Sequence, residues 1–302
     1  MDILAAVNQI VMMLLIMAVG FWLRKIAVLD AHMIKGISNL VIKVAMPALV
    51  FVLIQKESGT DGRMAFLGTV ILVIVWISLT TLIVFWGAKK MLPPENQAVF
   101  AALSVMSNSG FMGLPIIAAI YGDQGAFYLS AVVVGFNVTV YLTLEYIMTG
   151  KHPRPKVLLG NVGLMMTFLA LLTYVFRVRL PLPLSAMATH LGALTTPLTM
   201  LIAGARLTDF KLSALKDASL WLAMAFKLLI IPIVSFALFR ALGFEGVQLG
   251  VITMAFAMAS AASTQMFAER EGKNTLLAAT GISVSTILCL VTIPLVMLIT
   301  GI

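Results

Sequence analysis

One apolar segment, residues 97–121, contains a run of residues in its middle that a continuous helix does not tolerate. Glycine and proline disrupt helical hydrogen bonding, and the freed peptide groups find no partners in lipid. Such a break must be lined by protein or by a water-filled cavity. In secondary transporters, the half-helix ends at such breaks bind solutes and ions. The run reads Ser107, Asn108, Ser109, Gly110, Phe111, Met112, Gly113, Leu114 and Pro115.

The rest of the chain is equally apolar. Its 302 residues are 61% hydrophobic and 11% charged, with a mean hydropathy of +1.08, which excludes a soluble globular domain. The sequence therefore predicts an all-α membrane protein whose connections are too short for a soluble catalytic domain. Ten runs are long enough to span a bilayer: 3–23, 36–54, 64–88, 97–121, 125–148, 157–176, 184–204, 218–239, 247–268 and 274–300.

The basic residues predict the orientation, because cytoplasmic loops are enriched in Lys and Arg. With both termini non-cytoplasmic, 13 basic residues fall on the cytoplasmic face and 5 on the other, while Lys43 and Lys227 lie inside spans. We expect a multi-pass protein of the cell (inner or plasma) membrane that keeps its first span. The net charge of +8 is explained by this bias, so the lipid bilayer is the expected partner and nucleic acid is not.

The polar stretch 150–156 divides the spans into five and five. Because five is odd, residues 157–302 must enter the membrane from the opposite face to residues 1–149, which predicts an inverted repeat. Pro47 and Pro197 lie at similar positions in the two halves. The broken fourth span corresponds to the ninth, although small residues there also suit close helix packing. At that depth the ninth span carries Ser260, Ser263, Thr264 and Gln265.

A few polar side chains lie inside other spans. Lys227 falls near the middle of its span, where a charge is costly unless it finds a partner. Two roles are open for it: a built-in cation bonded to carbonyl groups of a broken helix, or a direct attraction for a substrate carboxylate. Lys43 can reach the interface, and Asn137 is expected to bond the broken helix or the solute. Positive charge without paired acids at depth favours an anionic solute.

Features of an enzyme or a metalloprotein are missing from the sequence. The histidines His32, His152 and His190 fall in loops or at span ends, and Cys289 is the single cysteine. Neither an intramolecular disulfide nor a cysteine metal site can therefore form. The chain also lacks HExxH and GxSxG patterns. We expect no catalysis, no cofactor and no metal.

Four segments together resemble the auxin efflux carrier family, which includes plant auxin carriers and bacterial organic-acid permeases. The segment Ser107–Ala126 is similar to the fourth-helix signature of that family, and the order of the other motifs agrees across the whole chain. The ninth span lacks the proline that relatives usually carry there. The remaining segments are VAMPALVF (Val44–Phe51), TPLTMLIAGARL (Thr196–Leu207) and FKLLIIP (Phe226–Pro232).

The resemblance implies an inverted repeat in which the fourth and ninth helices cross at their broken centres. Helices one, two, six and seven would form a scaffold, and the others would move as an elevator. By similarity, Asn108, Gly110 and Pro115 would face Ser260, Ser263 and Thr264. The predicted substrate site comprises Lys43, Pro47, Asn108, Ser109, Gly110, Gly113, Pro115, Asn137, Lys227, Ser260, Ser263, Thr264 and Gln265.

The predicted function is secondary transport of a small organic anion, a carboxylate such as malate, malonate or an auxin-like acid. The first alternative is sodium-coupled uptake similar to that of bile acid carriers, with Asn108, Gln265 and unwound carbonyl groups binding the ion. The second is a channel or receptor without turnover. A second copy of the chain, forming a homodimer, is a further expected partner.

Overall fold

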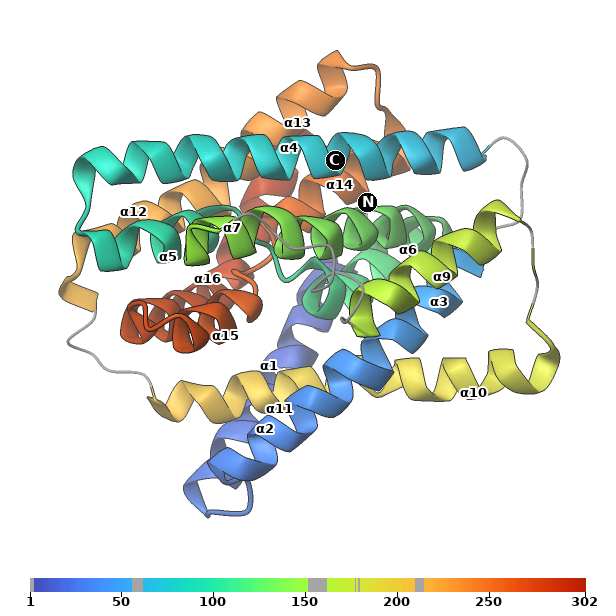
Figure 1. Ribbon diagram of the computed structural model, residues 1–302. Coiled ribbons are helices and arrows are strands. Elements are labelled where there is room, and N and C mark those ends of the chain that lie inside the picture. The colour runs from blue at the N-terminus through green and yellow to red at the C-terminus, as the bar shows by residue number, and fades with distance from the viewer. Residues whose placement is uncertain (1–2, 56–61, 152–161, 177, 179, 210–214) are drawn as a thin grey trace.

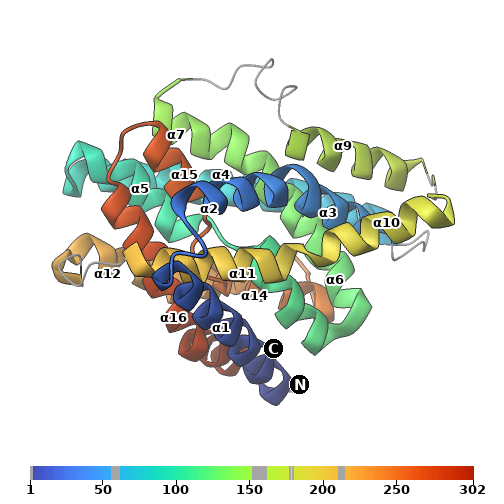
Figure 2. The same ribbon diagram turned by 90° about the horizontal axis from the view of Figure 1, so that it is seen from below.

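The computed structural model describes residues 3–55, 62–151, 162–176, 178, 180–209 and 215–302. Within these ranges the regular structure is helical, apart from one isolated β-bridge between Ser107 and Ser260. Figure 1 and Figure 2 show long helices running side by side, with shorter pieces meeting in the interior. The fold is therefore all-α, as the sequence predicts.

In chain order the helices are α1 (Ile3–Lys25), α2 (Ala31–Leu40), η1 (Val41–Ala45), α3 (Met46–Gln55), α4 (Gly62–Met91), α5 (Pro94–Val105), η2 (Ser109–Gly113), α6 (Leu114–Thr139), η3 (Val140–Leu144), α7 (Glu145–Thr149), α9 (Val162–Val175), α10 (Leu182–Ala193), α11 (Thr195–Arg206), η4 (Leu207–Asp209), α12 (Ala218–Ala225), η6 (Phe226–Ile230), α13 (Ile231–Ala241), α14 (Gly246–Ala257), α15 (Ser263–Arg270) and α16 (Thr275–Thr300). The segments η1, η2, η3 and η6 are π-helical turns, a geometry that recurs at functional sites.

Helical structure falls within each of the ten predicted spans. Six of the described segments are long and apolar enough to cross a membrane, which supports a multi-pass membrane protein, while the total of ten crossings stays a prediction. Of the predicted linker 150–156, residues 152–156 lie outside the described ranges. The six segments are Ala31–Leu53, Met64–Met91, Ser109–Thr149, Leu182–Arg206, Ala218–Ala241 and Thr275–Thr300.

Gly122 interrupts α6 between the predicted fourth and fifth spans. Its backbone has φ 62° and ψ −151°, a conformation that a residue with a side chain rarely adopts. The sequence predicts a tight turn at Gly122, Asp123 and Gln124, and the kink lies at the first of these residues. The helix α6 therefore contains the end of the predicted fourth span and the start of the fifth, with a kink between them.

The helices α1 and α11 pack backbone against backbone. A Cβ atom added to Gly20 would lie 2.1 Å from the carbonyl oxygen of Leu201, and one added to Gly204 would lie 1.8 Å from the carbonyl oxygen of Met17. Each helix thus presents a glycine to the other, the arrangement that lets membrane helices approach closely. Because no side chain fits between them, the two helices form a rigid pair.

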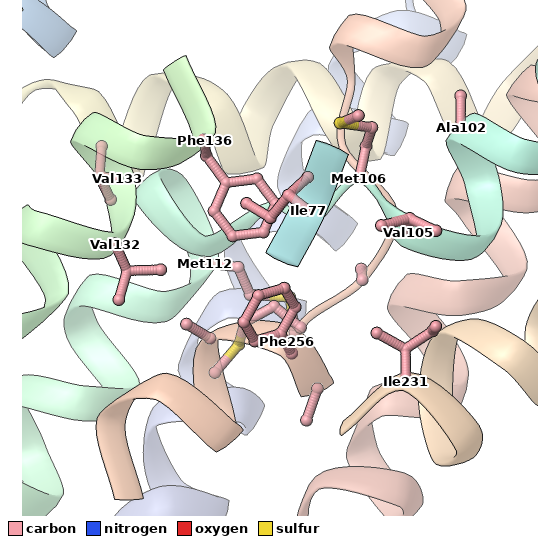
Figure 3. Close-up of a cluster of buried hydrophobic side chains, with 14 of the residues drawn as sticks. Ile77, Ala102, Val105, Met106, Met112, Val132, Val133, Phe136, Ile231 and Phe256 are labelled. Carbon is pink, nitrogen blue, oxygen red and sulfur yellow. The ribbon is translucent and has the colours of Figure 1, made fainter. Parts of the chain in front are cut away.

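The interior is filled by large apolar side chains. Figure 3 shows part of this core around the point where α5 and α14 end, where Met106, which follows α5, meets Met112 of η2, Phe136 of α6 and Phe256 of α14. These four side chains are nearly or fully buried. The broken segments are therefore enclosed by protein rather than lipid, as unpaired peptide groups require.

We predict that Gly204→Ala destabilises the protein by about 1–3 kcal/mol, the usual cost of overpacking, because the added methyl group overlaps the backbone at Met17. The measurement is the thermal unfolding midpoint in detergent. Gly87→Ala in α4 is the control, because a Cβ atom there meets nothing within 4 Å. Equal midpoints for both variants would contradict the close approach of α1 and α11.

Candidate functional site

The fourth span is interrupted, but only at the N-terminal edge of the stretch Ser107–Pro115 that the sequence predicts to unwind. The helix α5 ends at Val105, and Met106 is extended with φ −65° and ψ 124°. Asn108 follows with φ −80° and ψ 42°, before η2 begins. Regular α-helix resumes at Leu114, with Pro115 in its first turn, where the missing N–H of proline costs nothing.

A second break lies in the ninth span. The helix α14 ends at Ala257, and Met258 is extended with φ −65° and ψ 161°. The helix α15 starts at Ser263. The intervening residues contain no proline, so this segment leaves the helical path on small residues alone.

The two breaks meet in a short antiparallel pairing. The N–H of Asn108 donates to the carbonyl of Ala259 at 2.8 Å, and the N–H of Ala261 donates to the carbonyl of Met106 at 3.0 Å. Ser107 and Ser260 are the two residues directly opposite each other. Each unwound segment therefore supplies hydrogen-bond partners that lipid cannot give the other.

Two serine hydroxyl groups cap the helix ends reciprocally. Ser107 Oγ donates to the carbonyl of Ala255 in α14, and Ser260 Oγ donates at 2.7 Å to the carbonyl of Leu103 in α5. Both serines are buried. Carbonyl groups in the last turn of a helix lack partners within that helix, so each break caps the helix on the other side.

Lys227 lies in η6 and its side chain is fully buried. Its Nζ donates to the carbonyl of Phe256 at 3.0 Å and to that of Val105 at 3.4 Å. These carbonyls belong to the C-terminal ends of α14 and α5, where the helix dipole is negative. Of the two roles that the sequence left open, this geometry favours a built-in cation over direct contact with a substrate.

The other predicted site residues of the first half differ in how deeply they are buried. Asn108, Gly110 and Pro115 are half-buried, whereas Ser109 and Gly113 are buried. A Cβ atom added to Gly110 would meet the Met46 side chain at 3.5 Å and that of Val133 at 3.6 Å, which leaves room for a methyl group. Three further predicted residues lie on other helices: Asn137 is half-buried on α6, Pro47 is buried on α3 and Lys43 is exposed on η1.

The residues predicted in the second half lie at the start of α15. Ser263 and Thr264 have buried hydroxyl oxygens without a hydrogen-bond partner in the described structure, and Thr264 is fully buried. Gln265 instead donates to Glu269 Oε1 at 2.8 Å. An unpaired buried hydroxyl is costly, so the two hydroxyl groups at this helix N-terminus suit a ligand.

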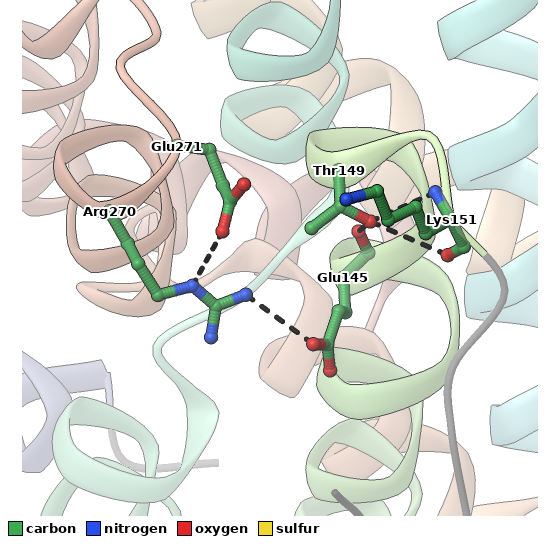
Figure 4. Close-up of polar contacts among 5 residues, drawn as sticks. All are labelled: Glu145, Thr149, Lys151, Arg270 and Glu271. Atoms are coloured by element: carbon green, nitrogen blue, oxygen red, sulfur yellow. Dashed lines mark hydrogen bonds and ion pairs between the residues drawn. The ribbon is translucent and has the colours of Figure 1, made fainter.

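Charged residues gather where α15 ends. Arg270 donates to Glu271 at 2.7 Å and lies 3.4 Å from Glu145 of α7, as Figure 4 shows. Lys151 N donates to Thr149 Oγ1 at 3.0 Å beside them. Arg270 is about half exposed, and exposed ion pairs contribute little to stability, so this cluster adds little to the stability of the fold.

Three side chains that hydrogen-bond at the breaks were missed by the sequence analysis. Ser107 was seen only as part of the break, and Ser285 was not considered. Cys289 was set aside as a lone cysteine, yet its Sγ donates at 3.6 Å to the carbonyl of Ala257. The available signal was the spacing of Ser285 and Cys289, which puts both on one face of α16.

Comparison with known proteins identifies the family. The profile of the membrane transport protein family matches residues 5–159 and 163–297. The chain belongs to this family. This agrees with the resemblance to auxin efflux carriers and makes the protein a membrane transporter rather than an enzyme.

Two archaeal relatives match over nearly their whole length. An uncharacterized transporter of Methanothermobacter thermautotrophicus is 26% identical over 302 residues, covering 98% of both chains. An uncharacterized transporter of Methanocaldococcus jannaschii is 22% identical over 305 residues, covering 95% of this chain and 96% of the relative. Neither name specifies a substrate.

We predict that Lys227→Met still inserts into the membrane but unfolds at a lower temperature. The carbonyls of Val105 and Phe256 lose a donor, and an unsatisfied buried group costs about 1–3 kcal/mol. The control is Lys43→Met, which removes the same charge from an exposed side chain. A Lys227→Met protein as stable as that control would contradict a capping role.

Proposed function

We propose that this transporter carries a small organic anion and that the anion binds at the N-terminus of α15. The proposal rests on a difference between the helix ends at the crossing, by which we mean the pairing of residues 106–108 with residues 258–262. Its carbonyl ends have a cationic partner within the protein, whereas its N-terminal end has unpartnered hydroxyl groups. The negative C-terminal ends of α5 and α14 receive the ammonium group of Lys227. The positive N-terminus of α15 has the unpartnered hydroxyl groups of Ser263 and Thr264, which suits a carboxylate.

The chain is proposed to cross the membrane ten times as an inverted repeat of residues 1–149 and 157–302, with both termini away from the cytoplasm. The reciprocal hydrogen bonds of the two breaks support this arrangement, since the hydroxyl groups of Ser107 and Ser260 each donate to a carbonyl in the last turn of the opposite helix. The predicted fourth and ninth spans then correspond, and their breaks lie at the same depth. Substrate-binding roles for the other predicted residues, apart from Lys227, stay part of this proposal.

Elevator-like movement is proposed for the body that contains the crossing. Interhelical hydrogen bonds join its members: α4 to α13 through Trp76 and Ser235, α4 to α14 through Thr69 and Gln248, and η3 to α4 through Thr143 and Ser78. The pair α1 and α11, by contrast, is held by the glycine contacts. We therefore propose that the helices joined by these hydrogen bonds move as one body relative to the pair α1 and α11.

Sodium coupling is less well supported. Carbonyl groups at the crossing would be the natural sodium ligands, but many already accept hydrogen bonds from the protein. A sodium ion would have to share these oxygens with the protein donors that already bind them. The carbonyls concerned are those of Leu103, Val105, Met106, Ala255, Phe256, Ala257 and Ala259.

The test is counterflow into proteoliposomes that contain the purified protein. Labelled mono- and dicarboxylates are supplied outside, with the same unlabelled acid inside, in sodium or in choline buffer. We expect uptake that is stimulated by internal acid and is equal in both buffers. Uptake without this stimulation would indicate a channel, sodium dependence would revive the alternative, and no uptake of any acid would overturn the proposal.

We predict that Thr264→Val raises KM for the transported acid about tenfold, equivalent to about 1.4 kcal/mol, because one donor at the anion site is lost. The control is Thr253→Val, which removes an equally buried hydroxyl that donates within α14 to the carbonyl of Leu249 at 2.8 Å. Uptake kinetics measure both variants. Equal KM values would remove Thr264 from the site.

A further inference from the structure

The two breaks are held in different ways. At the first, Pro115 lies in the first turn of the new helix, and the side chain of Val133 lies near Gly110. Figure 3 shows Val132, Val133 and Phe136 of α6 on this side of the core, all apolar. Packing and proline therefore shape the first break. The second break has no proline, so another restraint must fix its backbone.

The pairing of the two breaks leaves particular backbone groups unsatisfied. In an antiparallel pair whose neighbours exchange the hydrogen bonds, the N–H groups of the two opposed residues point away from each other's segment. Ser107 and Ser260 are such a pair, because Asn108 and Ala261 make the hydrogen bonds. The N–H of Ser260 thus needs a partner outside the pairing.

The last helix supplies that partner. The N–H of Ser260 donates at 3.0 Å to Ser285 Oγ, and Ser285 Oγ in turn donates at 2.9 Å to the carbonyl of Ile282. One turn further along α16, Cys289 Sγ donates to the carbonyl of Ala257 at 3.6 Å. Ser285 and Cys289 are both fully buried, so α16 contacts the backbone on both sides of Met258.

We propose that Ser285, assisted by Cys289, is a positioning residue that fixes the second break and thereby aims the N-terminus of α15. Ser263 and Thr264 follow Ser260 by three and four residues, so a rotation of the Ser260 peptide reorients their amide and hydroxyl groups. The hydroxyl and the thiol restrain this break in the way that proline and apolar packing restrain the first. The link to anion binding rests on the proposed function, whereas the link to the backbone does not.

The chain offers a matched control beside Ser285. Thr286 is also buried, and its Oγ1 donates at 2.7 Å to the same carbonyl of Ile282. Removal of either hydroxyl takes one hydrogen bond from α16, but only the removal of Ser285 also takes the acceptor of Ser260 N–H. The difference between Ser285→Ala and Thr286→Val therefore isolates the contact with the break.

Hydrogen–deuterium exchange of the purified full-length protein in lipid nanodiscs tests the proposal. Ser285→Ala is expected to speed exchange in the peptide that covers residues 258–263 at least about tenfold, because the local opening free energy falls. Thr286→Val should leave that peptide unchanged, and Ser285→Thr, which keeps a hydroxyl, should restore protection. Cys289→Ala should have a smaller effect, since a thiol is a weak donor.

Equal exchange of residues 258–263 in Ser285→Ala and Thr286→Val would overturn the proposal. This readout needs no substrate, so failure to find a transported anion would overturn the proposed function without touching the restraint. With a transported acid in hand, Ser285→Ala should raise KM about tenfold and Thr286→Val should not. Matching KM values with altered exchange would overturn the link to the anion site alone.

Discussion

Every peptide group in the membrane interior needs a hydrogen-bond partner, and this requirement governs the centre of the transporter. Two helices are interrupted there, which frees N–H and C=O groups that lipid cannot satisfy. The two interruptions lie side by side, so that the N–H groups of Asn108 and Ala261 each donate to a carbonyl of the opposite segment. The serines Ser107 and Ser260 then cap the opposite helix ends. Neither break could persist alone.

The crossing separates two kinds of helix end by charge. Carbonyl ends are neutralised from within, because Lys227 reaches both of them from η6. The N-terminal end of α15 keeps its positive dipole and two unpaired hydroxyl groups. Unpaired donors at a positive helix end are the basis for the proposed anion site. The hydrogen bonds of the buried lysine in the structure go to the carbonyl groups of Val105 and Phe256.

The first interruption was predicted around Asn108–Pro115, and the non-helical residues lie at the start of that stretch, at Met106 and Asn108. Gly110 and Gly113 instead belong to the π-helical turn η2, and Pro115 belongs to the first turn of α6. The second break was harder to predict, since Ser260, Ser263 and Thr264 suit packing as well as unwinding. The restraint that we propose comes from Ser285 and Cys289 on α16, which are 25 and 32 residues away in sequence from the groups they contact. Lys227 was recognised as anomalous because a midplane charge is costly in any context, yet its partners could not be chosen without coordinates.

The sequence by itself determined the membrane class, the helical content, the family and the position of the first interruption. These depend on hydrophobic runs and on glycine and proline, whose effects do not require a neighbour. Only the tertiary structure decided which carbonyl groups Lys227 caps, which hydroxyl groups stay unpaired and how α16 holds the second break. Hydrogen bonds between distant segments depend on distance and direction, and neither is written in the order of residues along the chain.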